Sequence, residues 1–178
     1  MCRFRLFHHY AYEALNRTLE CIDHLDFLFG EPAFINQLDP SKSEKKAFLI
    51  NADSLELSNK LQQKRVARDS ADWIERKVAI KTVRQSNLLH GKLCHVANAG
   101  VEEAILGSSN FTARGLGLGN GNNNIELNLI VDNSRDRQEL KQWFKEIWNN
   151  DKLVKDVKDD VLQYLRKLYA NQTDPYPM

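Results

Sequence analysis

The sequence lacks the signatures of a secreted, zinc-binding or membrane-spanning protein. Its 178 residues include three cysteines, Cys2, Cys21 and Cys94, an odd number at wide spacings and without a CxxC pair. This argues against a disulfide framework and a zinc ribbon, and it fits a reducing cytoplasm. No apolar run reaches the roughly 18 residues of a transmembrane helix, and residues 1–10 hold two arginines and two histidines where a signal peptide is apolar. We therefore expect a cytoplasmic chain with no membrane partner.

An excess of charge of either sign is also missing. The 25 basic and 24 acidic side chains give a formal net charge of +1, so bulk charge does not indicate a nucleic-acid partner. A local cluster could still bind a polyanion: Lys60, Lys64, Arg65 and Arg68 fall within nine residues. A solvated helix face is the alternative, and the cluster taken alone favours it.

The length allows one core, and we expect one domain at residues 1–170 followed by a tail or the start of a linker at 171–178. Apolar periodicity predicts helices at 10–23, from 53 or 54 to 74, from 134 or 136 onward and at 153–169, and strands at 25–29, 77–83, 88–96, 103–106 and 125–131. The apolar stripe of the second helix includes Val66, Ala67 and Ile74. The order predicts an α/β fold with a mixed sheet flanked by helices.

A histidine and a lysine two residues apart, His90 and Lys92, lie in a predicted strand. Residues two apart on a strand project from the same face, so the imidazole and the ammonium would point together. The pair suits phosphate chemistry, because the cation can hold nonbridging oxygens while the imidazole attacks phosphorus or moves a proton. The polar face of an exposed strand is the alternative, and the pair alone favours it.

A turn with the sequence Gly107-Ser108-Ser109-Asn110 follows the next predicted strand. Glycine permits a tight turn where the backbone comes close to a ligand. The Ser108 hydroxyl and the Asn110 amide can donate to an anionic oxygen. An ordinary helix N-cap explains the same residue types, and the turn alone favours that interpretation.

Glu126 lies at the start of the last predicted strand, within Asn124-Ile125-Glu126-Leu127-Asn128. A carboxylate there can accept from the Nδ1–H of a histidine, which selects the tautomer and stabilises the imidazolium. A surface acid on an edge strand is the alternative.

Together these residues resemble the phospholipase D superfamily, whose HxK and GSxN motifs match His90-x-Lys92 and Gly107-Ser108-x-Asn110. Glu126 matches the position of the acid in nuclease members. The string from Leu88 to Asn133 is similar to the phospholipase D-like modules at the N-terminus of bacterial helicases and in some restriction endonucleases. The resemblance implies a single HKD half-domain with the mixed α/β fold of that family.

Three features depart from the family pattern. The full motif has an aspartate a few residues after the lysine, where this chain has Cys-His-Val-Ala at 94–97; its absence argues against a lipase more than against catalysis. The segment 115–124 is long and rich in glycine and asparagine, as a substrate loop or an unstructured insertion would be. Residues 1–9 are short for the strand and helix that family domains place before Phe27. An N-terminal truncation would explain this.

The resemblance implies a mechanism with two histidines, one attacking phosphorus and one protonating the leaving oxygen. This chain has one HxK motif, and its other histidines have no lysine two residues later: His8, His9, His24 and His95. A second copy would complete the site in a homodimer. Lys92 and Asn110 of both copies would hold the phosphoryl oxygens, and Glu126 would orient each His90. The scheme requires no metal and no other cofactor.

We therefore expect a metal-independent phosphodiesterase, an endonuclease that cuts DNA through a phosphohistidine intermediate, as a dimer or as the N-terminal module of a helicase. The alternative is a non-catalytic DNA-binding module of a helicase, whose motor would lie outside this chain because no GxxxxGK[ST] loop is present. A lipid phosphodiesterase is the least favoured class. The cluster Lys60, Lys64, Arg65 and Arg68 is the expected nucleic-acid contact.

Overall fold

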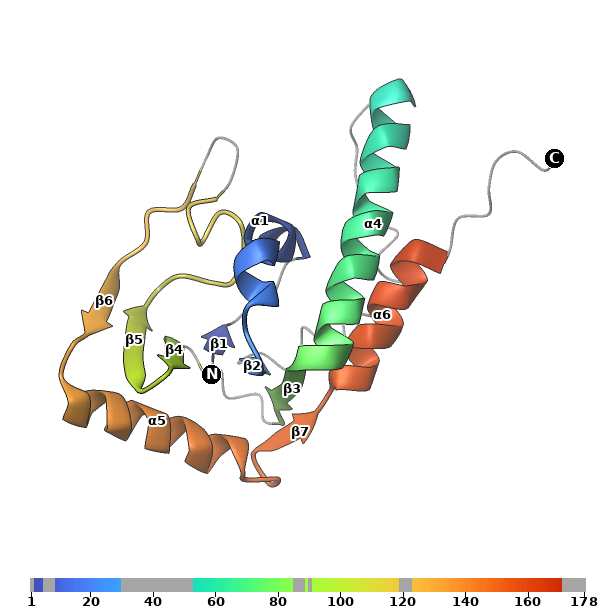
Figure 1. The fold of residues 1–178 in the computed structure, drawn as a ribbon. Helices are drawn as coiled ribbons and strands as arrows, with labels where there is room; N and C mark the ends of the chain where they lie inside the picture. Colours follow the sequence, from blue (N-terminus) through green and yellow to red (C-terminus); the bar gives the residue numbers. More distant parts are fainter. Residues whose placement is uncertain are drawn as a thin grey trace.

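The fold is an α/β arrangement on a mixed sheet, as the sequence predicts (Figure 1). A computed structural model describes residues 2–4, 9–29, 53–84, 89, 91–118 and 123–170. Within these ranges the sheet has seven strands in the order β6-β5-β4-β1-β2-β3-β7. Their bounds are β1 Cys2–Phe4, β2 Leu25–Phe29, β3 Val78–Val83, β4 Lys92–Asn98, β5 Val101–Gly107, β6 Asn128–Val131 and β7 Val154–Asp156.

Parallel pairs form the middle of the sheet, and antiparallel pairs extend it on both sides. The strand β2 is parallel to β1 and to β3, while β4, β5 and β6 follow one another antiparallel and β7 lies antiparallel to β3. The helices are α1 His9–Glu20, α4 Asp53–Lys77, α5 Ser134–Trp148 and α6 Lys158–Ala170. None of these described helices is long and apolar enough to cross a bilayer.

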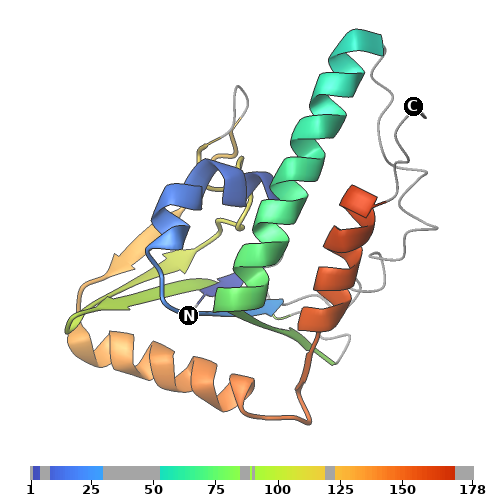
Figure 2. The ribbon, with the colours of Figure 1, turned by 45° about the vertical axis from the view of Figure 1, so that its right-hand side comes forward.

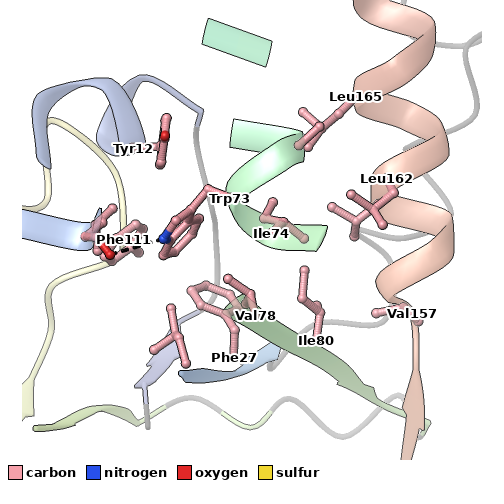
Figure 3. Packing of buried hydrophobic residues seen from close by; sticks show 14 of the residues in the cluster. Tyr12, Phe27, Trp73, Ile74, Val78, Ile80, Phe111, Val157, Leu162 and Leu165 are labelled. Atoms are coloured by element: carbon pink, nitrogen blue, oxygen red, sulfur yellow. Dashed lines mark hydrogen bonds between the residues drawn. The ribbon is translucent and has the colours of Figure 1, made fainter. Parts of the chain in front are cut away.

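The larger core lies between the sheet and the helices α1, α4 and α6, while α5 lies on the other face (Figure 2). Figure 3 shows Trp73 and Ile74 of α4 near Phe27 and Ile80 of the sheet. Trp73 is 1% exposed, its Nε1 donates to the Leu19 carbonyl oxygen at 3.2 Å, and its ring centroid lies 5.3 Å from that of Tyr12. The buried Val66, Ala67 and Ile74 confirm the predicted stripe of this helix, to which Trp73 adds the largest side chain.

A smaller core forms between the sheet and α5. It contains Leu28 of β2, Leu93 of β4, Ala104 of β5 and Phe144 of α5, all almost fully buried. Successive strand residues point to opposite faces, so Phe27 and Leu28 contribute to different cores. This alternation assigns every described residue of β4, β5 and β6 to the α1 side or to the α5 side.

The C-terminal part of the chain differs from the prediction of one helix at 153–169. Residues 154–156 form β7, and α6 begins at Lys158. The Asp156 carboxylate accepts from the Lys158 backbone N–H at 2.8 Å, which is an N-terminal cap and starts the helix there. Val154 pairs with Val83 at the margin of the sheet. An apolar period of three to four residues does not distinguish a short edge strand from the first turn of a helix.

One further strand was not predicted, and two begin later than predicted. Cys2–Phe4 forms β1, between β2 and β4, although residues 1–9 are short for the strand and helix expected there. The strand predicted at 88–96 begins at Lys92, and the strand predicted at 125–131 begins at Asn128. Glu126 therefore lies in the approach to β6 and not within it.

Replacing Trp73 with alanine should lower the free energy of unfolding by about 3–5 kcal/mol, the range for removing a fully buried aromatic side chain. Trp143, which is 38% exposed on α5, is the matched control, and its replacement should cost less than about 1 kcal/mol. Urea denaturation followed by circular dichroism measures both. Equal losses of unfolding free energy in the two variants would show that the larger core is not the main source of stability.

Candidate active site

The register of the sheet brings three parts of the predicted site to one place. Lys92 at the start of β4 pairs with Gly107 at the end of β5, and Gly107 pairs with Asn128 at the start of β6. Cys94, two residues after Lys92, packs against the larger core, between the sheet and the helices α1, α4 and α6. Lys92 therefore projects toward the α1 side of the sheet. The turn after Gly107 and the segment before Asn128 therefore lie beside a half-buried lysine.

Gly107 allows β5 and β6 to approach closely at this end. A Cβ on Gly107 would lie 2.5 Å from the Leu127 carbonyl oxygen and would overlap the Asn128 side-chain oxygen. Beyond it, the Ser108 backbone N–H donates to the Leu127 carbonyl oxygen at 3.0 Å. The Leu127 N–H donates at 3.0 Å to the Ser108 Oγ and not to a backbone carbonyl. A hydrogen bond to a side chain thus replaces a backbone hydrogen bond between β5 and β6, and this explains why β6 starts only at Asn128.

The Glu126 carboxylate is held by donors on both of its oxygens. The Ser108 hydroxyl donates to Oε2 at 2.5 Å, and the Asn124 side-chain amide donates to Oε1 at 3.0 Å. The hydrogen bonds from Ser108 and Asn124 lower the pKa of Glu126 below its usual value, burial opposes this, and the charge of Lys92 lowers it further. Glu126 is therefore ionised at neutral pH, in an orientation set by its neighbours and within the field of Lys92.

Asn110 begins a tight turn that is anchored in the core. The next residue, Phe111, is buried, and its ring lies edge-on to Phe27 at 6.0 Å between centroids. The Asn110 Oδ1 is buried and accepts no hydrogen bond from the residues that the structure describes. A Cβ on Gly115 would lie 2.6 Å from the Asn110 carbonyl oxygen, so the turn closes tightly on itself. The turn therefore fixes the Asn110 backbone, and the group that could donate to an anionic oxygen is the side-chain Nδ2 and not this buried Oδ1 acceptor.

The predicted alternative of a helix N-cap at Ser108 does not describe this turn. Residues 113–117 form turns and not a helix, and the Gly115 N–H is bound by the Thr112 Oγ1 at 3.0 Å. The Ser108 Oγ instead contacts Glu126 and Leu127. Ser108 therefore joins the end of β5 to the acid.

His90 lies outside the described residues, while Leu89 and Gly91 on either side of it are described. Two other histidines with described side chains lie away from Lys92. The imidazole of His24 contacts the Asp26 carboxylate at 2.8 Å beside β2. His95 is three residues after Lys92 on β4, so it projects from the opposite face of the sheet.

His95 belongs to a charged cluster under α5. It is 4% exposed, and its Nε2 lies 3.6 Å from the Oε2 of Glu102. The Glu102 carboxylate accepts from Lys141 of α5 at 2.6 Å through Oε1 and from Gln138 of α5 at 2.7 Å through Oε2. Burial lowers the pKa of His95, and the hydrogen bond from Lys141 lowers the pKa of Glu102. The cluster ties α5 to β4 and β5, on the face away from Lys92.

The predicted nucleic-acid contacts lie on α4, which contacts β3. In the order of the sheet, β1 and β2 separate β3 from β4, the strand that carries Lys92. Arg65 and Arg68 are exposed and Lys64 is half-buried, while the side chain of Lys60 lies outside the described part. The Arg65 guanidinium donates to Glu13 of α1 at 3.0 Å. The charge of Arg65 is therefore balanced within the chain.

The described residues contain no group of three or more histidine, cysteine, aspartate or glutamate side chains placed to hold a metal ion. Metal independence remains a prediction that an activity assay would test.

Sequence reasoning missed the asparagines on either side of Glu126. Asn124 holds the carboxylate, and Asn128 donates to the Ser109 hydroxyl at 2.8 Å, which ties β6 to the turn. Polar residues at every second position, Asn124, Glu126 and Asn128, were the available signal, because alternation places such residues on one side of an extended chain.

Replacing Asn124 with alanine should raise the pKa of Glu126 toward its ordinary value, and replacing Ser108 should raise it more, because the Ser108 bond is the larger cause of the depression. A depressed pKa in the folded state stabilises the protein above the ordinary pKa, and this contribution is lost as the pH falls through the depressed value. Carboxyl NMR titration measures the shift. Asn123→Ala is the control, because Asn123 donates to the Gly117 carbonyl oxygen. An unchanged pKa in Asn124→Ala would remove Asn124 from the site.

Comparison with known families supports the resemblance drawn from the motifs. A family model described as the PLD-like domain of cardiolipin synthase matches residues 22–148, more than half of the 178 residues. Among curated proteins no match was found. The matched stretch runs from before β2 to the end of α5 and includes Lys92, Ser108, Asn110 and Glu126. Membership indicates phosphodiesterase-type chemistry, while the likeness to nucleases and helicase-fused modules stays a prediction. The chain belongs to the phospholipase D-like domain family.

Proposed function

We propose that this protein is a phosphodiesterase that cleaves DNA, with His90, Lys92, Ser108, Asn110 and Glu126 at its site. The observation that carries the proposal is that the register places Lys92, the turn of Ser108 and Asn110, and the oriented Glu126 carboxylate at one end of β4, β5 and β6. These groups match what a phosphoryl transfer needs: a cation for the nonbridging oxygens, an amide beside them, and an acid to orient an imidazole.

The reaction would proceed in two displacements. In the first, the His90 imidazole attacks phosphorus, a phosphorus–nitrogen bond forms, and the bond to the leaving oxygen breaks as that oxygen takes a proton from a second imidazole. In the second, this imidazole removes a proton from water, the water oxygen attacks phosphorus, and His90 is released. Because the chain has one HxK motif, we propose that a second copy supplies the second imidazole.

The structure suggests a different task for Ser108 from the one expected from sequence. A serine hydroxyl has one hydrogen to donate, and that of Ser108 is donated to Glu126. We infer that Ser108 positions the acid, while Lys92 and the Asn110 amide bind the phosphoryl oxygens. Glu126 keeps free lone pairs on both oxygens after binding Ser108 and Asn124, so it can still accept from the Nδ1–H of His90. The lysine and amide supply charge stabilisation without a metal in this scheme.

His90→Ala should abolish cleavage of a single-stranded DNA oligonucleotide in the presence of excess chelator, because it removes the nucleophile. Lys92→Ala should lower kcat by at least about 100-fold, since a fixed donor to the developing charge is lost. Gel analysis of the products measures both, and circular dichroism confirms folding. The matched control is His24→Ala, whose imidazole contacts Asp26 away from the site and whose replacement should leave kcat unchanged.

Wild-type turnover by a folded His90→Ala protein would defeat the proposed mechanism. Strict dependence on added magnesium would defeat the metal-free scheme. DNA binding without any cleavage by the wild-type protein would favour the alternative of a binding module.

Duplex DNA should bind to the basic face of α4, and four phosphate contacts would make log affinity fall with log salt at a slope of about −3.6. Charge reversal at Lys64 and Arg68 should flatten the slope by about 2. Fluorescence anisotropy at a series of salt concentrations measures both. Reversal of Arg166 on α6, which is paired with Glu75 at 3.0 Å, serves as the control. The same salt dependence in the wild type and in the α4 variant would show that Lys64 and Arg68 are solvated surface residues that do not contact DNA.

A further inference from the structure

The parallel strands of the sheet end at the same edge that carries the site. The strands β1, β2 and β3 have their carboxyl ends there, because Phe4 pairs with Phe29 and Phe29 pairs with Thr82. Since β4 is antiparallel to β1, it begins at this edge with Lys92. Open α/β sheets bind ligands outside the carboxyl ends of their parallel strands. Side chains just beyond β3 can therefore meet a ligand that is bound at Lys92.

Arg84 is the residue that follows β3 at this edge. Its backbone N–H donates to the Leu153 carbonyl oxygen at 2.7 Å, so the backbone hydrogen bonds between β3 and β7 continue by one residue. Thr82, two residues before Arg84, pairs with Phe29 of the larger core. Alternation therefore places Arg84 on the α1 side of the sheet, the side toward which Lys92 projects.

The Arg84 guanidinium is fixed through its Nε atom. This Nε donates at 2.9 Å to the carbonyl oxygens of Asp151 and Val154, in the turn that leads into β7. The turn is closed by the Asn150 carbonyl oxygen, which accepts from the N–H groups of Leu153 and Val154. Within the part of the chain that the structure describes, neither Nη group of Arg84 has a hydrogen bond or an ion pair. The exposed side chain thus keeps the N–H donors of both Nη groups in a fixed plane.

Lys81, on the α5 side of the same strand, shows the contrast with a purely structural cation. Its Nζ donates to the Trp148 carbonyl oxygen at 2.9 Å and lies 5.1 Å from the centroid of the Trp148 ring, and its side chain is 20% exposed. The Asp151 carboxylate lies 4.0 Å from this Nζ and is not a partner of the Arg84 guanidinium. Both cations hold the connection from α5 to β7, but Arg84 does so through its Nε alone.

A guanidinium held in one plane suits a phosphate, which two parallel N–H bonds can bind. Arg84 and Lys92 belong to strands that are three spacings apart, about 14 Å across the sheet. A stacked single strand advances about 3.4 Å per nucleotide, so about four nucleotides cover this distance. A strand whose scissile phosphate lies at Lys92 can therefore bring another of its phosphates to Arg84.

We propose that Arg84 binds a second phosphate of single-stranded DNA, about four nucleotides from the bond that is cleaved at Lys92. This inference rests on the proposed function, because it takes DNA as the substrate. The strand then runs along one edge of the sheet, from β4 across the ends of β1 and β2 to β3. Arg84 acts in substrate binding and not in the chemical step, and strands that reach it bind more tightly than shorter ones.

Arg84→Gln separates the charge of the side chain from its structural contact, because glutamine can still donate to the turn carbonyls. In a His90→Ala background, in which DNA is bound but not cleaved, this change should weaken binding of a single strand of about 12 nucleotides by about tenfold or more. It should also flatten the slope of log affinity against log salt by about 0.7, the value for one phosphate contact on a single strand. Fluorescence anisotropy measures both quantities, and circular dichroism confirms folding.

Two further variants make the test specific. Arg84→Lys keeps the charge and should keep the salt slope of the parent protein. Lys81→Gln is the matched control, because it removes the same charge from the same strand on the α5 side, and it should change neither the affinity nor the slope. In the active protein, Arg84→Gln should raise KM for the oligonucleotide while kcat stays within about twofold, as expected when uniform binding is lost.

Parental affinity and salt slope in Arg84→Gln would overturn the inference. An equal loss in Lys81→Gln would indicate an effect of net charge, and weaker binding by Arg84→Gln with an unchanged slope would assign Arg84 to the turn alone; both outcomes would overturn it as well. The proposed function fails separately. A protein with His90 intact that binds single strands through Arg84 but cleaves none supports the second phosphate position and defeats the enzyme. Cleavage whose KM is the same in Arg84→Gln supports the enzyme and defeats this inference.

Discussion

The close approach of β5 to the chain entering β6 is the constraint on which the site depends. Only a residue without a side chain fits at Gly107, because the Leu127 carbonyl oxygen and Asn128 occupy the space that a Cβ would need. That approach brings the Ser108 hydroxyl within reach of the Leu127 N–H and of Glu126. The backbone hydrogen bonds between β5 and β6 end there, and Glu126 is held outside β6. The motif glycine therefore acts by allowing two strands to meet, which brings Ser108 to a carboxylate 18 residues further along the sequence.

The alternation of strand residues divides the chemistry of the sheet between two faces. On β4, Lys92 projects toward the α1 side, and the buried His95 projects toward α5, where Glu102 and Lys141 surround it. A buried histidine with nearby charges resembles a catalytic group when considered alone. Its position on the opposite face from Lys92 and Glu126 makes it part of the packing of α5 instead. Proximity in the sequence therefore does not imply membership of one site on a strand.

The same division accounts for the exposed apolar surface. On the α5 side of β4 and β5, Leu93 and Ala104 are buried and Leu106 is 39% exposed, while Val96, Ile105 and Ile130 are exposed on the α1 side. Exposed aliphatic side chains in a contiguous patch cost solvation free energy in an isolated chain.

The sequence by itself determined the α/β class, most of the helices and strands, and the family, because apolar periodicity and the spacing of the HxK and GSxN motifs are local properties of the chain. The positions of β1 and β7 required the tertiary structure: three-residue strands carry too little periodicity, and neighbouring strands define them. Alternation alone places Lys92 and His95 on opposite faces once the strand is predicted. The hydrogen bond from Ser108 to Glu126, by contrast, required the tertiary structure, because the pairing of β5 with β6 brings together residues that are 18 apart in the sequence.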